Sequence, residues 1–123
     1  MPTINCFYDP FTGVIGSIPD SCTVANGTTE TIKVNLSLVP SALGTIVFDN
    51  PPLTWGSNGF PLGTTTVPPD GGSSQETITV PNSNSGTINV SYGFLINFVY
   101  TSPTGDNVIG AGDPTIINDG TGG

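Results

Sequence analysis

Side chains that could carry acid–base, metal or nucleophile chemistry are scarce in this sequence of 123 residues. It contains seven Asp, two Glu, two Cys and a single Lys, with neither His nor Arg. Without imidazole, the usual zinc, copper and haem sites are excluded, as is the general base of most Ser and Cys nucleophiles. Without a stripe of cationic side chains, binding of nucleic acid through its phosphates is excluded as well.

The nine carboxylates fit turns better than a catalytic pair. Nearly all stand beside Gly, Pro or Asn, where Asp accepts hydrogen bonds from nearby backbone amides. None lies in the Asp-Thr/Ser-Gly context of an aspartic protease, so we predict that the protein is not an enzyme and uses no cofactor. Loop carboxylates also bind calcium, and the candidate ligands are Asp106, Asp113 and Asp119. Turn chemistry accounts for all three, so we expect no bound metal.

Cys6 and Cys22 are the only thiols, and they enclose a segment rich in Gly and Pro. A disulfide between them would close an N-terminal strand and loop, residues 1–25, and stabilise it by roughly 3 kcal/mol. The alternative is two small buried apolar side chains in a reducing compartment. A catalytic cysteine is not expected, because nothing nearby would lower its pKa.

One group of residues is typical of a ligand platform. Trp55, Asn58 and Phe60 lie in a Gly-rich stretch and combine aromatic faces with an amide, which are the means of holding a sugar. The alternative is that Trp55 is a core residue between two sheets, as a single Trp in a β-sandwich often is.

Composition indicates which elements must position these residues. Gly and Pro total 29, Ile and Val total 21, and strong helix formers are too few for long helices. The start lacks a basic and apolar leader, and the longest dense apolar run, residues 94–100, is too short to span a membrane. We expect one all-β domain over residues 1–123 with no membrane insertion. An extracellular, surface or virion location is favoured and a cytoplasmic one stays open.

Period-two alternation predicts the strands. It is clearest over residues 31–39 and 76–80, and it continues without a slip over residues 87–100, which predicts one long strand bent at Gly93. Leu95 and Val99 on its second face predict that its second half is covered on both sides. Further strands are expected at residues 3–8, at 44–48 with a continuation at 53–55 after a corner, and at 64–67 and 115–118, and a frayed tail is expected at 119–123.

About seven such strands with uneven loops predict an antiparallel β-sandwich with Greek-key, immunoglobulin-like connections; an up-and-down barrel is the alternative. The inward positions define the predicted core: Ile32, Val34, Leu36, Ile78, Val80, Ile88, Val90, Ile96 and Phe98.

The C-terminal third, with its alternating run over residues 92–100, a Gly-Asp turn and Asp113-Pro-Thr-Ile-Ile-Asn118, resembles the ending of small bacterial immunoglobulin-like or cupredoxin-like sandwich domains. The resemblance implies a fold and no activity. If the domain is cupredoxin-like, it departs from the copper-binding members because it has no His ligand.

The leading functional hypothesis is a structural or interaction module that self-associates as a filament, surface layer or virion component. Sandwiches commonly place Lys on edge strands to block strand-to-strand pairing, and here only Lys33 is available. Pairing could use the sheet edges or residues 3–8, which either join their own sheet or are donated to a neighbour. The alternative function is a glycan-binding module, with or without calcium.

Overall fold

The computed structural model describes residues 2–112 and 114–121. Within that part of the chain the regular elements are all strands, so no helix there is long and apolar enough to cross a membrane. The strands are β1 (Thr3–Asp9), β2 (Val14–Ile18), β3 (Ser21–Val24), β4 (Thr29–Leu38), β5 (Thr45–Trp55), β6 (Thr65–Val67), β7 (Gln75–Pro81), β8 (Val90–Thr101), β9 (Asn107–Gly112) and β10 (Thr115–Asn118).

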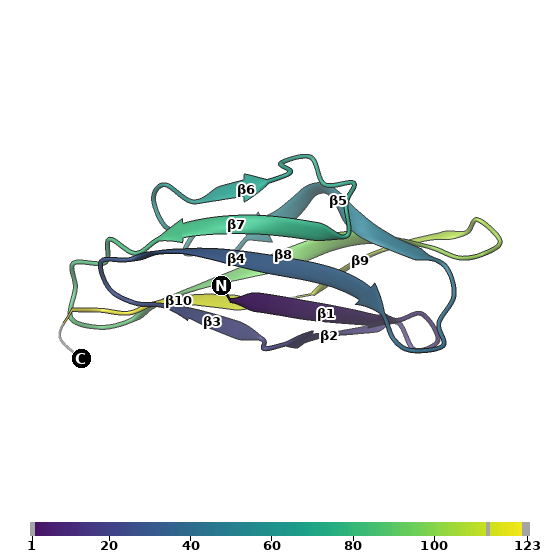
Figure 1. Ribbon diagram of the computed structural model, residues 1–123, viewed down its shortest axis with the longest axis horizontal. Coiled ribbons are helices and arrows are strands. Elements are labelled where there is room, and N and C mark those ends of the chain that lie inside the picture. Colours follow the sequence, from purple (N-terminus) through teal and green to yellow (C-terminus); the bar gives the residue numbers. More distant parts are fainter. Residues whose placement is uncertain (1, 113, 122–123) are drawn as a thin grey trace.

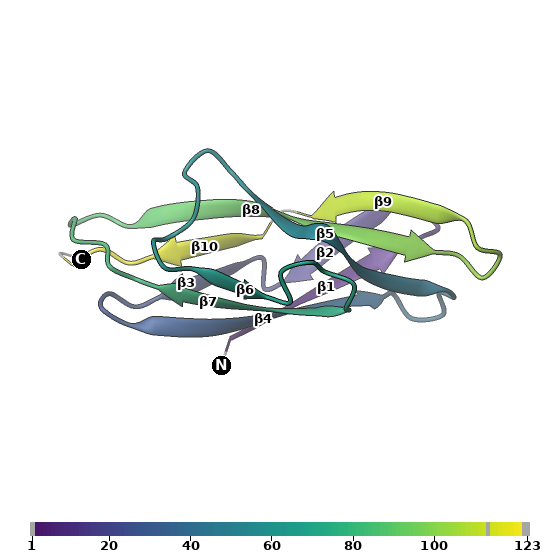
Figure 2. The same cartoon turned by 90° about the horizontal axis from the view of Figure 1, so that it is seen from above.

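The strands form two layers, which Figure 2 shows one above the other. The first sheet has the order β2-β1-β4-β7-β6, and the second has the order β3-β10-β8-β5 with β9 also paired to β8. The all-β prediction is confirmed, and the arrangement is consistent with a β-sandwich. The described residues form ten strands, where about seven were expected. The expectation of purely antiparallel sheets is wrong: both sheets are mixed, because β1 runs parallel to β4 and β3 runs parallel to β10.

The two inner faces share one apolar core. Alternation in β4 and β7 is confirmed, since Ile32, Val34 and Ile78 are completely buried while the residues between them are half-buried. Seven of the nine predicted core residues are buried: Ile32, Val34, Leu36, Ile78, Val80, Ile96 and Phe98.

The predicted start of the long strand is wrong. β8 begins at Val90, which is half-buried, and Ile88 is 75% exposed. Residues 84–88 instead form a turn held by Asn84, whose side chain donates to the Ile88 carbonyl and accepts from the Gly86 amide. An Asn side chain that bonds the backbone in this way competes with the sheet ladder, and it ends the strand without disturbing the sequence alternation.

The predicted cover over both faces of β8 is also wrong. β8 is central within its sheet, since β5 lies on one side and β9 and β10 lie on the other. No other described strand covers its second face, where Leu95 is 42% exposed and Val99 is half-buried.

On one side of the molecule, neighbouring edge strands belong to different sheets. β9 and β10 face β8 in one continuous register, residues 107–112 against 101–96 and residues 115–118 against 93–90. β3 pairs with the outer edge of β10, but β2, which precedes it, crosses to β1 in the first sheet (Figure 1). The change of sheet occurs at Pro19, which has no amide hydrogen to donate to a ladder. Therefore the outer edge of β9 is left without a strand partner among the described residues.

Candidate functional site

The predicted ligand platform is only partly assembled. The Trp55 and Phe60 rings lie 5.8 Å apart, but Trp55 also packs against the core through Phe94, with ring centroids 4.9 Å apart. The side-chain amide of Asn58 donates to the Ser91 carbonyl at 2.7 Å and is therefore used within the fold. The structure brings the two aromatic residues together and turns the amide away from a ligand.

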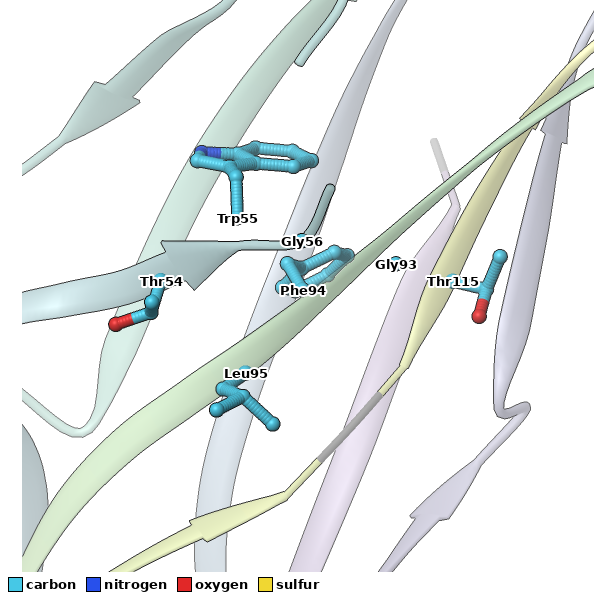
Figure 3. Close-up of a pocket in the computed structure, with 7 residues that line it drawn as sticks. All are labelled: Thr54, Trp55, Gly56, Gly93, Phe94, Leu95 and Thr115. Atoms are coloured by element: carbon cyan, nitrogen blue, oxygen red, sulfur yellow. The ribbon is translucent and has the colours of Figure 1, made fainter. Parts of the chain in front are cut away.

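A pocket of about 300 Å³ lies beside Trp55, and Figure 3 shows its lining residues. They come from the end of β5, the middle of β8 and the start of β10: Thr54, Trp55, Gly56, Gly93, Phe94, Leu95 and Thr115. The two glycines leave space that side chains would otherwise fill, and the Gly56 amide donates to the Gly93 carbonyl. The chemistry offered is two hydroxyls and an apolar floor, with no charged group in the lining.

The two cysteines are free thiols in opposite sheets. Cys6 lies on β1, is completely buried and contacts the Ser17 hydroxyl at 3.5 Å, while Cys22 lies on β3. Burial raises the pKa of both thiols above the ordinary value. In the structure they are small apolar core residues, which is the second of the two sequence-based alternatives.

The two calcium candidates among the described residues, Asp106 and Asp119, do not lie together. Asp106 lies in the turn between β8 and β9, while Asp119 follows β10 at the other end of the molecule (Figure 1). The Asp106 carboxylate accepts from the Thr104 hydroxyl, and the Asp119 carbonyl accepts from the amides of Asn26 and Asn82. Asp113 lies outside the described residues. Within the described part of the chain, no three His, Cys, Asp or Glu side chains gather as a metal site.

The predicted frayed tail is hydrogen-bonded for part of its length. The Asp119 amide donates to the Val24 carbonyl, and the Thr121 amide donates to the Gly86 carbonyl. Residues 122 and 123 lie outside the described residues. The end of β10 is therefore tied to the loop before β8.

The most unusual acid was not identified from the sequence. Glu76, the second residue of β7, is completely buried, and both of its carboxyl oxygens lack a hydrogen-bond partner. Burial raises its pKa to about 7. A signal was present, because Glu76 has the same parity as the inward-facing Ile78 and Val80.

The open sheet edges are the surfaces that the sequence analysis named for pairing between copies. Lys33 lies on β4, a central strand, so no edge strand carries a cationic side chain. β2, one of the two edge strands of the first sheet, carries no charge and is largely apolar. With Phe7 of β1, its exposed Val14 and Ile18 form an apolar outer patch on the face of that sheet. The chain matches no protein-family model and no curated protein sequence, so the site is interpreted from its geometry alone.

Proposed function

We propose that the protein is a non-enzymatic structural module whose copies associate through the β2 and β9 edges. An edge strand presents unpaired backbone amides and carbonyls, and a second strand can add to them with main-chain hydrogen bonds. Repeated addition in one direction would give a filament, a surface layer or a virion component. The proposed fold in finer detail is an immunoglobulin-like sandwich with Greek-key connections.

The observation that carries the proposal is the contrast between edges. β5 is an edge strand with two prolines, an acid and a register shift between Phe48 and Leu53, all of which discourage pairing. β2 and β9 have none of these features and carry no charge. They are edges of opposite sheets that lie next to one another, with Ile15 of β2 beside Gly112 of β9.

The N-terminal strand is a less suitable donor. In the structure β1 lies inside its own sheet, paired in parallel with β4 and antiparallel with β2. Its inward side chains, Ile4, Cys6 and Tyr8, are buried in the common core. Donating β1 to a neighbour would remove these side chains from their own core, so we assign association to the edges.

The experiment places a lysine on the open edge. Ile18→Lys adds a cationic side chain at an exposed outward position of β2, where it blocks pairing without entering the core. Thr79→Lys on β7 is the matched control, because it makes the same change of charge on the outer face of a central strand. Sedimentation velocity and negative-stain microscopy should show assemblies for wild type and Thr79→Lys and a monomer for Ile18→Lys.

Salt provides an independent measurement. With a net charge of −8, copies repel one another, and added salt screens this repulsion by shortening the Debye length. Assembly should therefore strengthen between about 0.01 and 0.15 M salt. A wild-type protein that stays monomeric at high concentration and salt would contradict the proposal, as would an Ile18→Lys variant that assembles normally.

A second candidate function rests on the pocket beside Trp55. Its hydroxyls and apolar floor, and the exposed Phe60 nearby, suit a sugar or another small neutral ligand. A glycan array with wild type and Leu95→Asp separates the functions, because binding that this substitution abolishes would favour a ligand-binding module.

A further inference from the structure

Glu76 occupies a position that apolar residues hold elsewhere in the core. It faces Val34 of β4 in the antiparallel register and shares the inner face of the first sheet with Ile78. Its side chain is completely buried, and neither carboxyl oxygen has a partner. A carboxylate buried in this way loses its hydration without compensation, so burial favours the neutral acid relative to an exposed Glu.

No charged group among the described residues compensates Glu76. β4 carries Glu30 and Lys33, but Lys33 pairs with Thr77 and points to the outer face, and Glu30 lies four residues from Val34, about 13 Å along the strand. β5 carries Asp49 and β6 carries no titratable residue. The other titratable side chains on the inner faces, among the described residues, are thiols and phenols, which carry no positive charge: Cys6, Tyr8, Cys22 and Tyr100.

The chain just before Glu76 links the two sheets through backbone hydrogen bonds. We call residues 71–74 the strap. Its Gly72 amide donates to the Phe48 carbonyl and its Ser73 carbonyl accepts from the Phe48 amide, both at 2.8 Å, which covers the edge of β5. On the first sheet, the Ser74 carbonyl accepts from the Leu36 amide at 2.8 Å. Gly71 and Gly72 both have positive φ, a conformation that other residues adopt only with strain.

We propose that ionisation of Glu76 releases the strap and so makes this side of the sandwich open at alkaline pH and close at acidic pH. No described residue is placed to hydrogen-bond the carboxylate, so water must solvate it, and moving the adjoining strap is the shortest way to admit water. Release would free the amides of Phe48, Leu36 and Gly72 and uncover the edge of β5. The inference does not depend on the proposed function.

The sign of the effect follows from the raised pKa. Because the acid in the closed state has a pKa of about 7 against an ordinary value of 4.5, the closed state holds its proton more tightly. Closure is therefore most stable below pH 4.5, weakens as the pH rises above that value and levels off above about 7. Between pH 5.5 and 8.5 the opening equilibrium constant should rise about 30-fold.

Hydrogen exchange followed by NMR tests the proposal. After correction for the intrinsic rate, protection of the Phe48, Leu36 and Gly72 amides should fall about 30-fold from pH 5.5 to 8.5. In Glu76→Gln, which keeps the shape of the side chain without the charge, protection should not change with pH. Asp70→Asn is the matched control, since it removes one acid from the exposed loop before the strap and should behave as wild type.

Three results would overturn the proposal. The first is flat protection in wild type, and the second is an unchanged pH response in Glu76→Gln. The third is an equal loss at Ile96 in the centre of β8, which would mean that the whole sandwich opens rather than the strap. If Glu76→Gln does not fold, direct NMR titration of the wild-type carboxyl decides. An inflection near pH 7 would support the proposal, and one near 4.5 would refute it.

Discussion

Replacing Gly110 by Ala should destabilise the protein, because the ring of Phe98 occupies the space that the new methyl group would enter. Gly110 of β9 faces Phe98 of β8 directly in the register. A Cβ on Gly110 would lie 2.5 Å from Cζ and 2.9 Å from Cε2 of that ring. The ring has little room to move, since it is 2% exposed and packs on Tyr8 with centroids 4.9 Å apart.

Three substitutions give the magnitudes. Gly110→Ala should cost about 1–3 kcal/mol through overpacking, and Phe98→Ala about 3–5 kcal/mol through the cavity it leaves. In the double variant the methyl group has no ring to meet, so the total should be close to that of Phe98→Ala alone. The two sites should therefore couple by about 1–3 kcal/mol, instead of adding as distant sites do.

Urea unfolding, followed by the fluorescence of Trp55 under monomeric conditions, measures these free energies. Gly16→Ala is the control, because no heavy atom lies within 4 Å of its Cβ position and, like Gly110, Gly16 lacks a positive φ. It should be neutral or stabilise the protein by up to about 1 kcal/mol. A cost below about 0.5 kcal/mol for Gly110→Ala, or an additive double variant, would refute this account of the packing.

The remaining predictions concern the thiols and calcium. Cys6 and Cys22 should resist alkylation in the native protein and react in urea, because both are buried and both have a raised pKa; mass spectrometry that finds a Cys6–Cys22 disulfide in the native protein would contradict this. Calcium should raise the melting temperature by no more than about two degrees, because Asp106 and Asp119 lie at opposite ends of the molecule. A ligand at about 100 times its dissociation constant would raise the free energy of unfolding by roughly 2.7 kcal/mol. Calorimetry that shows a stabilisation of that size in calcium would require a calcium site.

Local patterns in the sequence identified seven of the 18 buried apolar residues in the described part of the chain, five of them in β4 and β7. The alternation of residues 31–39 and 76–80 identified the buried faces of β4 and β7 because a strand places successive side chains on opposite sides. The same rule applied to Glu76 would have placed it inside the core. It was overlooked because its acid type suggested a turn or a solvent-exposed face.

Tertiary structure decided where strands begin and which strands meet. Ile88 has the same parity as the inward-facing residues of β8, but hydrogen bonds from the Asn84 side chain hold its segment outside the sheet. The alternation of side chains does not show whether a residue is hydrogen-bonded to a neighbouring strand. The parallel pairing of β1 with β4, the central place of Lys33 and the separation of Asp106 from Asp119 are long-range relations. They depend on contacts between residues far apart in the chain, so no local pattern encodes them, and only the folded structure identified β2 and β9 as open edges and Glu76 as an unpaired buried acid.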